Sequence, residues 1–462
     1  MALNYVKKIL RLVRYGKDFC VILKDKSDDD TQKYVIRIYE LNQAKSVLEG
    51  TILRGLEDRG KSMSLYKFIT MESNLIALMV RGFRFYTEDK RYFSVFQGYP
   101  HQPAQSLDMS IIQPFLDHAK NIVFNGNAEV NDYMWKWFAF IYQNPTGMTG
   151  KEPVLIGAPG CGKNTFTNVL CQLIGSEYSK ANCSDASNYF GKFNTAIENT
   201  KLGILNELAD SESRNNRVDH DRLKTTVTES TIDINHKGRS QRYNVQNVFN
   251  LIVCTNHPQP LKMDPNDRRF VIIRPSDKYA ENHNDTVADK RMKMKYFNDL
   301  YRSMKAPGFY EHLAAYVKSI DLTDFELNDV PITEDKLEYI ELSKKPTDIL
   351  FERYITKFIP KDDGCGFSNA EIFQVYRGIV REIGFSGSTL TQTQVTHTLR
   401  TDYPLTSGKR LGYGSRSLTT VFKPEGLTRY AKQIEEAREM EANVLDPDAV
   451  SIPLSEDSDS DN

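Results

Sequence analysis

Apolar positions recur along the chain with two different periods. Between residues 17 and 100 they form short alternating runs such as DFCVILKD and KYVIRIYEL, which predicts a small mixed α/β region. Across residues 108–144 they recur every three to four positions, which predicts helices with one buried face. Short strands alternate with helical segments from residue 150 to about 275, and helices follow to about 345. This order of elements predicts the α/β fold class.

The pattern divides the chain into five parts. They are a small mixed α/β region (1–105), a helical segment (106–148), an α/β domain (149–345), a compact C-terminal domain (346–432) and a tail (433–462). Residues 435–462 carry ten acids against one base and few apolar side chains, so burial cannot offset the entropy of ordering them. We therefore expect a disordered acidic tail.

Charge outside the tail is weakly basic. The other 434 residues carry 59 bases and 51 acids, which suits a polyanionic partner. An ordinary solvated surface would show the same balance, so charge alone does not separate the two interpretations.

Composition excludes several classes of protein. The chain has no run of about 18 apolar residues and no secretory signal at its start, so we expect neither a membrane nor a secreted protein. Its six cysteines form no C-x-x-C pair and have no histidine at metal spacing, which argues against disulfides and zinc. We expect an intracellular protein of a reducing compartment.

A glycine-rich loop follows the short apolar strand at residues 154–156. Its sequence GAPGCGK fits G-x-x-x-x-G-K and leads into a helical run, so its backbone N–H groups can surround phosphates while the lysine contacts them. The predicted ATP-binding residues are Gly157, Ala158, Pro159, Gly160, Cys161, Gly162, Lys163, Asn164 and Thr165. Asn164 replaces the usual Ser or Thr after the lysine, so Mg²⁺ would be held by Asn164, by Thr165 or through water.

Two further strands end in polar residues. The strand at residues 202–205 leads to Asn206 and Glu207, and the glutamate is placed to polarise an attacking water. An exposed glutamate at the end of an ordinary strand is the plain alternative. Asn206 stands where an Asp would usually hold the water shell of a metal. The strand at residues 249–254 is followed by Asn256, which could contact the γ-phosphate or orient the water.

A pair of arginines and a predicted hairpin are further candidates for functional residues. Arg268 and Arg269 precede the apolar strand FVII and could serve the transition state of a neighbouring subunit, or could be surface charge. The alternation of Ile232, Ile234, Tyr243 and Val245 predicts a β-hairpin, with these four side chains behind its tip. The tip carries His236, Lys237 and Arg239, which suits contacts with nucleic-acid phosphates as well as a simple soluble turn.

Together these segments resemble the ATPase part of superfamily 3 helicases, found in viral, phage and plasmid primase-helicases and including the poxvirus type. The resemblance covers residues 108–345 and rests on GAPGCGKNTF, ILNE, INHKGR, CTN and DRRF. FSVFQGYP and the helix with Trp135 and Trp137 are similar to the segment that precedes the ATPase in primase-helicases of phage type.

The resemblance implies an AAA+ P-loop core, a helical collar before it, and a hexameric ring that binds ATP and Mg²⁺ at subunit interfaces. By position it implies a phosphate lysine (Lys163), a catalytic acid (Glu207), a sensor (Asn256), an arginine finger (Arg268 or Arg269) and a DNA-moving tip (His236 with Lys237). Asn164 and Asn206 depart from the family pattern. No primase motif is found in the first 150 residues, so a separate primase or polymerase is an expected partner.

The C-terminal domain has its own pattern. Residues 369–381 and 391–400 predict two helices joined by a tight turn, and the chain from Leu405 to Phe422 predicts a β wing. Residues 385–432 carry seven bases against two acids, which suits DNA, although many winged helices contact only proteins.

We therefore expect an ATP hydrolase that unwinds DNA in the replication of a viral, phage or plasmid-like replicon. Two alternatives stay open: a ring ATPase for DNA packaging or remodelling, and a weakly catalytic origin-binding scaffold.

Overall fold

The structure is a computed structural model, and it describes most of the chain. The described residues are 2–15, 18–26, 34–58, 61–206, 220–237, 241–257, 267–355, 367–383, 389–403, 405–407 and 419–422. The chain forms two compact units, Met1–Lys262 with Asn266–Pro331, and Met263–Pro265 with Ile332–Asn462. None of the described helices is long and apolar enough to cross a membrane.

The N-terminal region is mixed α/β, as its pattern predicts. Its four-stranded sheet has the order β3-β2-β1-β6. These strands are β1 (Leu10–Tyr15), β2 (Asp18–Lys26), β3 (Tyr34–Glu40) and β6 (Met79–Val80). The helices are α1 (Ala2–Ile9), α2 (Leu41–Gly50), α3 (Leu65–Thr70) and α4 (Glu72–Leu78). Two strand pairs add to it, β4 (Ile52–Asp58) with β5 (Lys61–Ser64) and β7 (Gly82–Arg84) with β8 (Tyr92–Ser94).

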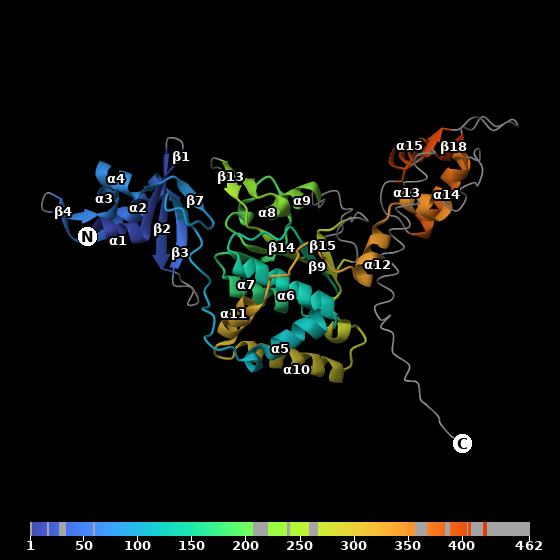
Figure 1. Cartoon of the computed structure of the whole chain (residues 1–462), viewed down its shortest axis with the longest axis horizontal. Helices are drawn as coiled ribbons and strands as arrows, with labels where there is room; N and C mark the ends of the chain where they lie inside the picture. Colours follow the sequence, from blue (N-terminus) through green and yellow to red (C-terminus); the bar gives the residue numbers. More distant parts are fainter. Residues whose placement is uncertain are drawn as a thin grey trace, which may run out of the picture. The chain divides into compact units, whose positions relative to one another are not determined.

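A five-stranded parallel sheet forms the centre of the first unit (Figure 1). Its strands are β9 (Glu152–Ile156), β10 (Ser179–Cys183), β11 (Leu202–Asn206), β14 (Asn250–Thr255) and β15 (Phe270–Ile273), in the order β10-β11-β14-β9-β15. The predicted α/β core is therefore confirmed as a mixed α/β fold with a parallel sheet. Since β14 lies between β9 and β11, the carboxyl ends of these three strands meet at one edge of the sheet.

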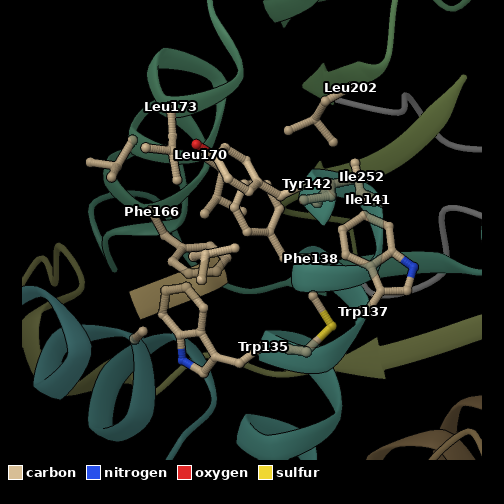
Figure 2. Packing of buried hydrophobic residues seen from close by; sticks show 14 of the residues in the cluster. Trp135, Trp137, Phe138, Ile141, Tyr142, Phe166, Leu170, Leu173, Leu202 and Ile252 are labelled. Carbon is tan, nitrogen blue, oxygen red and sulfur yellow. The ribbon is translucent and has the colours of Figure 1, made fainter. Parts of the chain in front are cut away.

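Helices cover this sheet and share its core. The predicted helices before the sheet are present as α5 (Met109–His118), a π-helical turn η1 (Ala119–Val123) and α6 (Ala128–Gln143). Figure 2 shows Trp137 and Phe138 of α6 packing in one cluster with Phe166 of α7 (Lys163–Ile174) and Ile252 of β14. Two later helices, α10 (Val287–Met304) and α11 (Phe309–Ser319), both contact α5.

Lys201 joins α6 to the sheet. Its side chain is fully buried directly before β11, and its Nζ donates hydrogen bonds to the carbonyl oxygens of Asn144 (2.8 Å), Pro145 (2.9 Å) and Gly147 (3.3 Å). These carbonyls follow the end of α6, where backbone acceptors lack partners within the helix. Burial lowers the pKa of Lys201 to about 7.

The predicted hairpin is present, but its register differs from the simple alternation. It consists of β12 (Thr231–Ile234) and β13 (Arg242–Gln246), and it follows α9 (His220–Thr228). Ile232 pairs with Val245 but Ile234 pairs with Arg242, so β13 carries one extra residue between the two pairs. Tyr243 lies on β13 behind the tip, as predicted, but its side chain is 65% exposed beside this bulge, so the fold of the hairpin does not rest on its burial.

Short helices complete the first unit. They are α8 (Ser187–Phe190) and the 3-10 turns η2 (Thr195–Ile197) and η3 (Asp277–Tyr279).

The second unit has its own small core. It contains α12 (Glu334–Ser343), α13 (Pro346–Ile349), a π-helical turn η4 (Leu350–Ile355), α14 (Asn369–Glu382) and α15 (Gln392–Asp402). A three-stranded antiparallel sheet joins β16 (Phe367–Ser368), β18 (Thr419–Phe422) and β17 (Leu405–Ser407). The two predicted helices are present as α14 and α15. The GKRLGYGSR loop of the predicted wing and the acidic tail lie outside the described residues, so the winged helix stays a prediction.

Candidate functional site

The glycine-rich loop lies at the carboxyl edge of the parallel sheet, between β9 and α7. Gly160 (φ +77°) and Gly162 (φ +97°) adopt the left-handed conformation that L side chains rarely take. At Gly162 a Cβ would also lie 2.5 Å from Cε1 of His118, so this position has no room for a side chain. The observed backbone thus requires glycine at positions 160 and 162.

A pocket of about 450 Å³ opens over this loop. It is lined by Pro159, Gly160, Cys161, Gly162, Lys163, Asn164, Thr165, Asn206, Cys254, Thr255, Asn256, Phe297 and Tyr301. Of the predicted phosphate-binding residues only Gly157 and Ala158 are not among the lining residues. The pocket therefore brings together residues that three separate sequence motifs singled out.

Among the described residues that line this pocket, Lys163 is the only cationic side chain. Its buried Nζ donates hydrogen bonds to the carbonyl oxygens of Gly157 (2.5 Å) and Ala158 (3.1 Å) and to Oδ1 of Asn256 (3.1 Å). The lysine thus touches the residue after β14 as well as its own loop. A cation beside backbone N–H groups at the start of a helix is suited to a polyphosphate.

The donors available to Mg²⁺ are neutral in the described part of the pocket. Asn164, Thr165 and Asn206 offer amide and hydroxyl oxygens, and Oδ1 of Asn206 is buried without a hydrogen-bond partner. No group of three or more His, Cys, Asp or Glu side chains that could hold a metal occurs among the described residues. Mg²⁺ prefers carboxylate ligands, so these residues fit a phosphate-bound ion better than an ion held by protein alone. Glu207 lies outside the described residues.

Arg268 and Arg269 are not brought to this pocket. They precede β15, whose first residue Phe270 pairs with Glu152 at the start of β9, whereas the glycine-rich loop follows the end of β9. At about 3.3 Å per residue these ends of β9 are roughly 13 Å apart. The backbone N–H of Arg269 donates to buried Asp267 (2.7 Å). Both arginines therefore belong to the opposite edge of the sheet.

The hairpin tip is only partly as predicted. Lys237 is exposed, but Nε2 of His236 lies 3.2 Å from Oε2 of Glu198. The same glutamate forms an ion pair with Arg242, whose guanidinium lies 4.5 Å from the centre of the Phe83 ring. His236 is therefore engaged within the chain, whereas Lys237 is available. Arg239 lies outside the described residues.

Sequence reasoning missed several residues around the loop. Buried His118 at the end of α5 lies 2.9 Å from the hydroxyl of Tyr296 through Nδ1 and 3.4 Å from the Gly162 carbonyl through Nε2. Burial lowers the pKa of His118 to about 4, so this imidazole is neutral at pH 7. The hydroxyl of Tyr301 lies 3.1 Å from Oγ1 of Thr165. These contacts join helices far apart in sequence, so no local motif reveals them.

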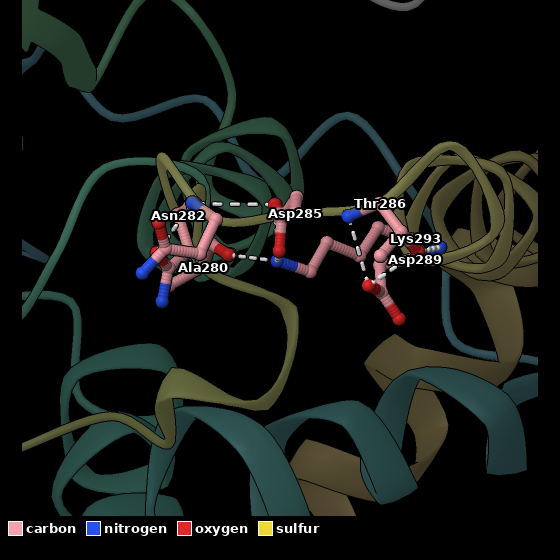
Figure 3. A network of polar contacts seen from close by, with 7 residues as sticks. Ala280, Asn282, Asp285, Thr286, Asp289 and Lys293 are labelled. Atoms are coloured by element: carbon pink, nitrogen blue, oxygen red, sulfur yellow. Dashed lines mark hydrogen bonds and ion pairs between the residues drawn. The ribbon is translucent and has the colours of Figure 1, made fainter.

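A polar network holds the segment that contacts the glycine-rich loop. Figure 3 shows Lys293 of α10 between the carbonyl of Ala280 and the carboxylate of Asp285, which it approaches to 2.7 Å. Nearby, the backbone N–H of Glu281 donates to the Pro159 carbonyl (3.1 Å). The segment held by Lys293 thus contacts the glycine-rich loop directly.

One comparison with known proteins matches the region of the glycine-rich loop. Residues 155–269 match the model of a family of unknown function, DUF5906, which is well under half of the chain. The DNA Primase-polymerase of Nitratiruptor phage NrS-1 is 25% identical over 260 residues. That alignment covers 56% of this chain but 33% of the phage protein, so the chain spans about a third of the curated relative that it matches.

Solved structures show a related fold over nearly the whole chain. The apo structure of the NrS-1 C terminal region is 19% identical, with a TM-score of 0.59, and the match covers 91% of this chain and 97% of that one. The A form of the same region has a TM-score of 0.56 at 19% identity and covers 91% and 98%. The chain therefore shares the fold of the C-terminal region of the phage NrS-1 protein.

Proposed function

We propose that this chain is an ATP-dependent DNA helicase of a viral, phage or plasmid-like replicon that works as a ring of copies. One observation carries the proposal: Nζ of Lys163 and Oδ1 of Asn256 lie 3.1 Å apart in a pocket formed by the glycine-rich loop and the ends of β11 and β14. The name of the phage relative, a DNA primase-polymerase, supports a role in DNA replication.

The residues have distinct tasks in this proposal. The loop N–H groups and Lys163 hold the β- and γ-phosphates of ATP, and Asn256 orients the lysine or the attacking water. Glu207, which follows β11 directly, accepts the proton of that water. The oxygens of Asn164, Thr165 or Asn206 would hold Mg²⁺, and the ion would supply positive charge that offsets the charge of the phosphates.

The position of the arginines supports an oligomer. Arg268 and Arg269 lie at the opposite edge of the sheet from the pocket of their own chain, so only a second copy could bring them to a nucleotide. The sheet order, with β14 between β9 and β11, supports the AAA+ assignment that the sequence resemblance implies. A hexamer is the ring size that the resemblance implies.

Two linked measurements test the proposal. The wild type should hydrolyse ATP with and without DNA. It should also displace a strand from forked DNA with a 3′ or a 5′ tail. Glu207→Gln should keep ATP affinity and lose turnover, because it removes a base and not a phosphate ligand. ATP turnover without strand displacement would favour a packaging or remodelling motor.

One observation favours a second candidate. The described Mg²⁺ donors are neutral, and Asn164 and Asn206 replace residues that usually serve the metal. A weakly catalytic, origin-binding replication scaffold would fit this donor set. ATP binding without measurable turnover at saturating Mg²⁺ would decide in its favour.

A further inference from the structure

Two aromatic side chains form one wall of the phosphate-loop pocket. Phe297 and Tyr301 lie four residues apart on α10, and therefore on one face of that helix. Their rings are stacked, with centroids 6.2 Å apart and an interplanar angle of 29°. Tyr301 is 43% exposed although it lines the pocket, so much of its surface is available to a ligand.

This wall directly adjoins the glycine-rich loop. Oγ1 of Thr165 and the hydroxyl of Tyr301 are 3.1 Å apart, and Cε1 of Phe297 lies 3.4 Å from the place a Cβ would take on Gly162. The pocket thus has a polar end, with Lys163 and Asn256, and an aromatic end on α10. A nucleoside triphosphate has the same two ends, a polyanion and a flat aromatic base.

Helix α10 is held by several contacts directly before this wall. Lys293, four residues before Phe297, is paired with Asp285 (Figure 3). Tyr296, directly before Phe297, is hydrogen-bonded to buried His118 (2.9 Å). The Tyr296 ring also stacks on Tyr279, with centroids 3.8 Å apart. Because these contacts hold the helix against the segment beside the loop, the rings are held in place before any ligand binds, which lowers the entropic cost of binding.

We propose that Phe297 and Tyr301 are the subsite for the base of the bound nucleoside triphosphate, a purine stacking on the ring of Tyr301. This inference rests on the proposed function, since it takes the loop as the phosphate site. The Tyr301 hydroxyl, held by Thr165, sets the orientation of the ring. Burial of two aromatic faces supplies affinity that the phosphates do not.

The experiment compares a ligand that has a base with one that has none. Binding of ATP and of inorganic tripolyphosphate to the full chain is measured by calorimetry for the wild type, Tyr301→Ala and Tyr301→Phe. We expect Tyr301→Ala to weaken ATP binding by about tenfold or more and to leave tripolyphosphate binding within about twofold. Tyr301→Phe, which keeps the ring, should restore most of the ATP affinity.

Three results would overturn the inference. If Tyr301→Ala binds ATP as the wild type does, the ring does not contact the base. If it weakens ATP and tripolyphosphate equally, Tyr301 acts only by positioning Thr165. If the wild type binds neither ligand, the phosphate site itself, and with it the proposed function, is wrong. Thermal melting identifies a variant that fails to fold. If Tyr301→Ala fails to fold, Phe297→Leu provides the same comparison between the two ligands. Tyr354→Ala, at an exposed tyrosine of the second unit, is a matched control.

Discussion

The sequence predicts the residues that meet at the glycine-rich loop better than it predicts the side-chain positions of the β12–β13 hairpin. At the loop, residues from three motifs meet in one pocket, and Lys163 reaches Asn256 across 93 positions of sequence. At the hairpin, two of the predicted residues differ from the prediction. His236 pairs with Glu198, and Tyr243, which the alternation placed behind the tip, is largely exposed.

The difference has a physical cause. The loop is specified by glycines whose φ angles no other residue adopts easily, so the motif itself fixes the backbone. The hairpin is specified by alternation, and one extra residue beside Asn244 (φ +53°) reverses which side chains face outward. A motif of backbone constraints therefore predicts a site more reliably than a motif of side-chain alternation.

The largest expected effect tests the loop side of this comparison. Lys163→Ala should reduce kcat/KM for ATP hydrolysis by about 1000-fold or more, because the lysine is the cation of the phosphate site. Steady-state ATPase assays without DNA measure this. Lys180→Ala, at an exposed lysine of β10, is the matched control. Hydrolysis retained in Lys163→Ala would show that the nucleotide binds elsewhere.

Lys201 tests the scaffold that carries the loop. Lys201→Met removes the lysine donor from the Pro145 carbonyl, whereas the carbonyls of Asn144 and Gly147 keep the Gly147 N–H and the Asn250 amide as donors. The variant should lower the free energy of unfolding by about 2 kcal/mol at pH 9. Because burial lowers the folded-state pKa to about 7, the unfolded chain binds more protons between pH 7 and its ordinary value of 10.5. Stability of the wild type should therefore rise across this window relative to Lys201→Met. Urea unfolding of both proteins at pH 7 and pH 9 measures this rise. If the difference in stability between the two proteins were the same at both pH values, the pKa of Lys201 would not be lowered.

His118 tests whether packing behind the loop depends on pH. Its folded-state pKa of about 4 lies below the usual 6.5, so the unfolded chain binds more protons as pH falls between these values. The wild type should lose about 2 kcal/mol through this group on going from pH 7 to pH 5. His118→Asn, which cannot titrate, should show a correspondingly smaller loss in urea unfolding. Equal losses in the two proteins would place the pH dependence in other groups.

Lys237 and His236 test the hairpin side separately. Lys237→Ala should weaken single-stranded DNA binding by about threefold to fivefold and reduce the salt dependence by about one counterion, as expected for one phosphate contact. Lys237→Ala should lower DNA binding and the DNA-stimulated part of ATP hydrolysis, and should not lower ATP hydrolysis without DNA. His236→Ala should change the salt dependence less, because its imidazole faces Glu198. Fluorescence anisotropy at several salt concentrations distinguishes them, and equal slopes would mean that His236 also contacts DNA.

Four of the five parallel strands, α7, the helices before the sheet and the phosphate loop could be predicted, since apolar period and glycine spacing encode them locally. The fifth strand, β10 (SKANC), was not predicted, because it has no apolar pattern. The contacts of His118 with Gly162 and of Tyr301 with Thr165 could not, because each joins segments separated by many residues. The strand β15 was predicted, yet the distance of Arg268 from the pocket follows only from its pairing with β9. Pairing and tertiary packing, not local pattern, decide these positions.

The smallest expected effect concerns the hairpin register itself. Since Tyr243 is 65% exposed, Tyr243→Ser should change the free energy of unfolding by no more than about 0.5 kcal/mol. Ile234, fully buried on the facing strand, provides the contrast, because Ile234→Ala should cost about 3 kcal/mol through lost packing. Urea unfolding of the two variants compares them directly. If Tyr243→Ser were as destabilising as Ile234→Ala, both side chains would share one buried face, and the simple alternation would describe the hairpin better than the bulge at Asn244 does.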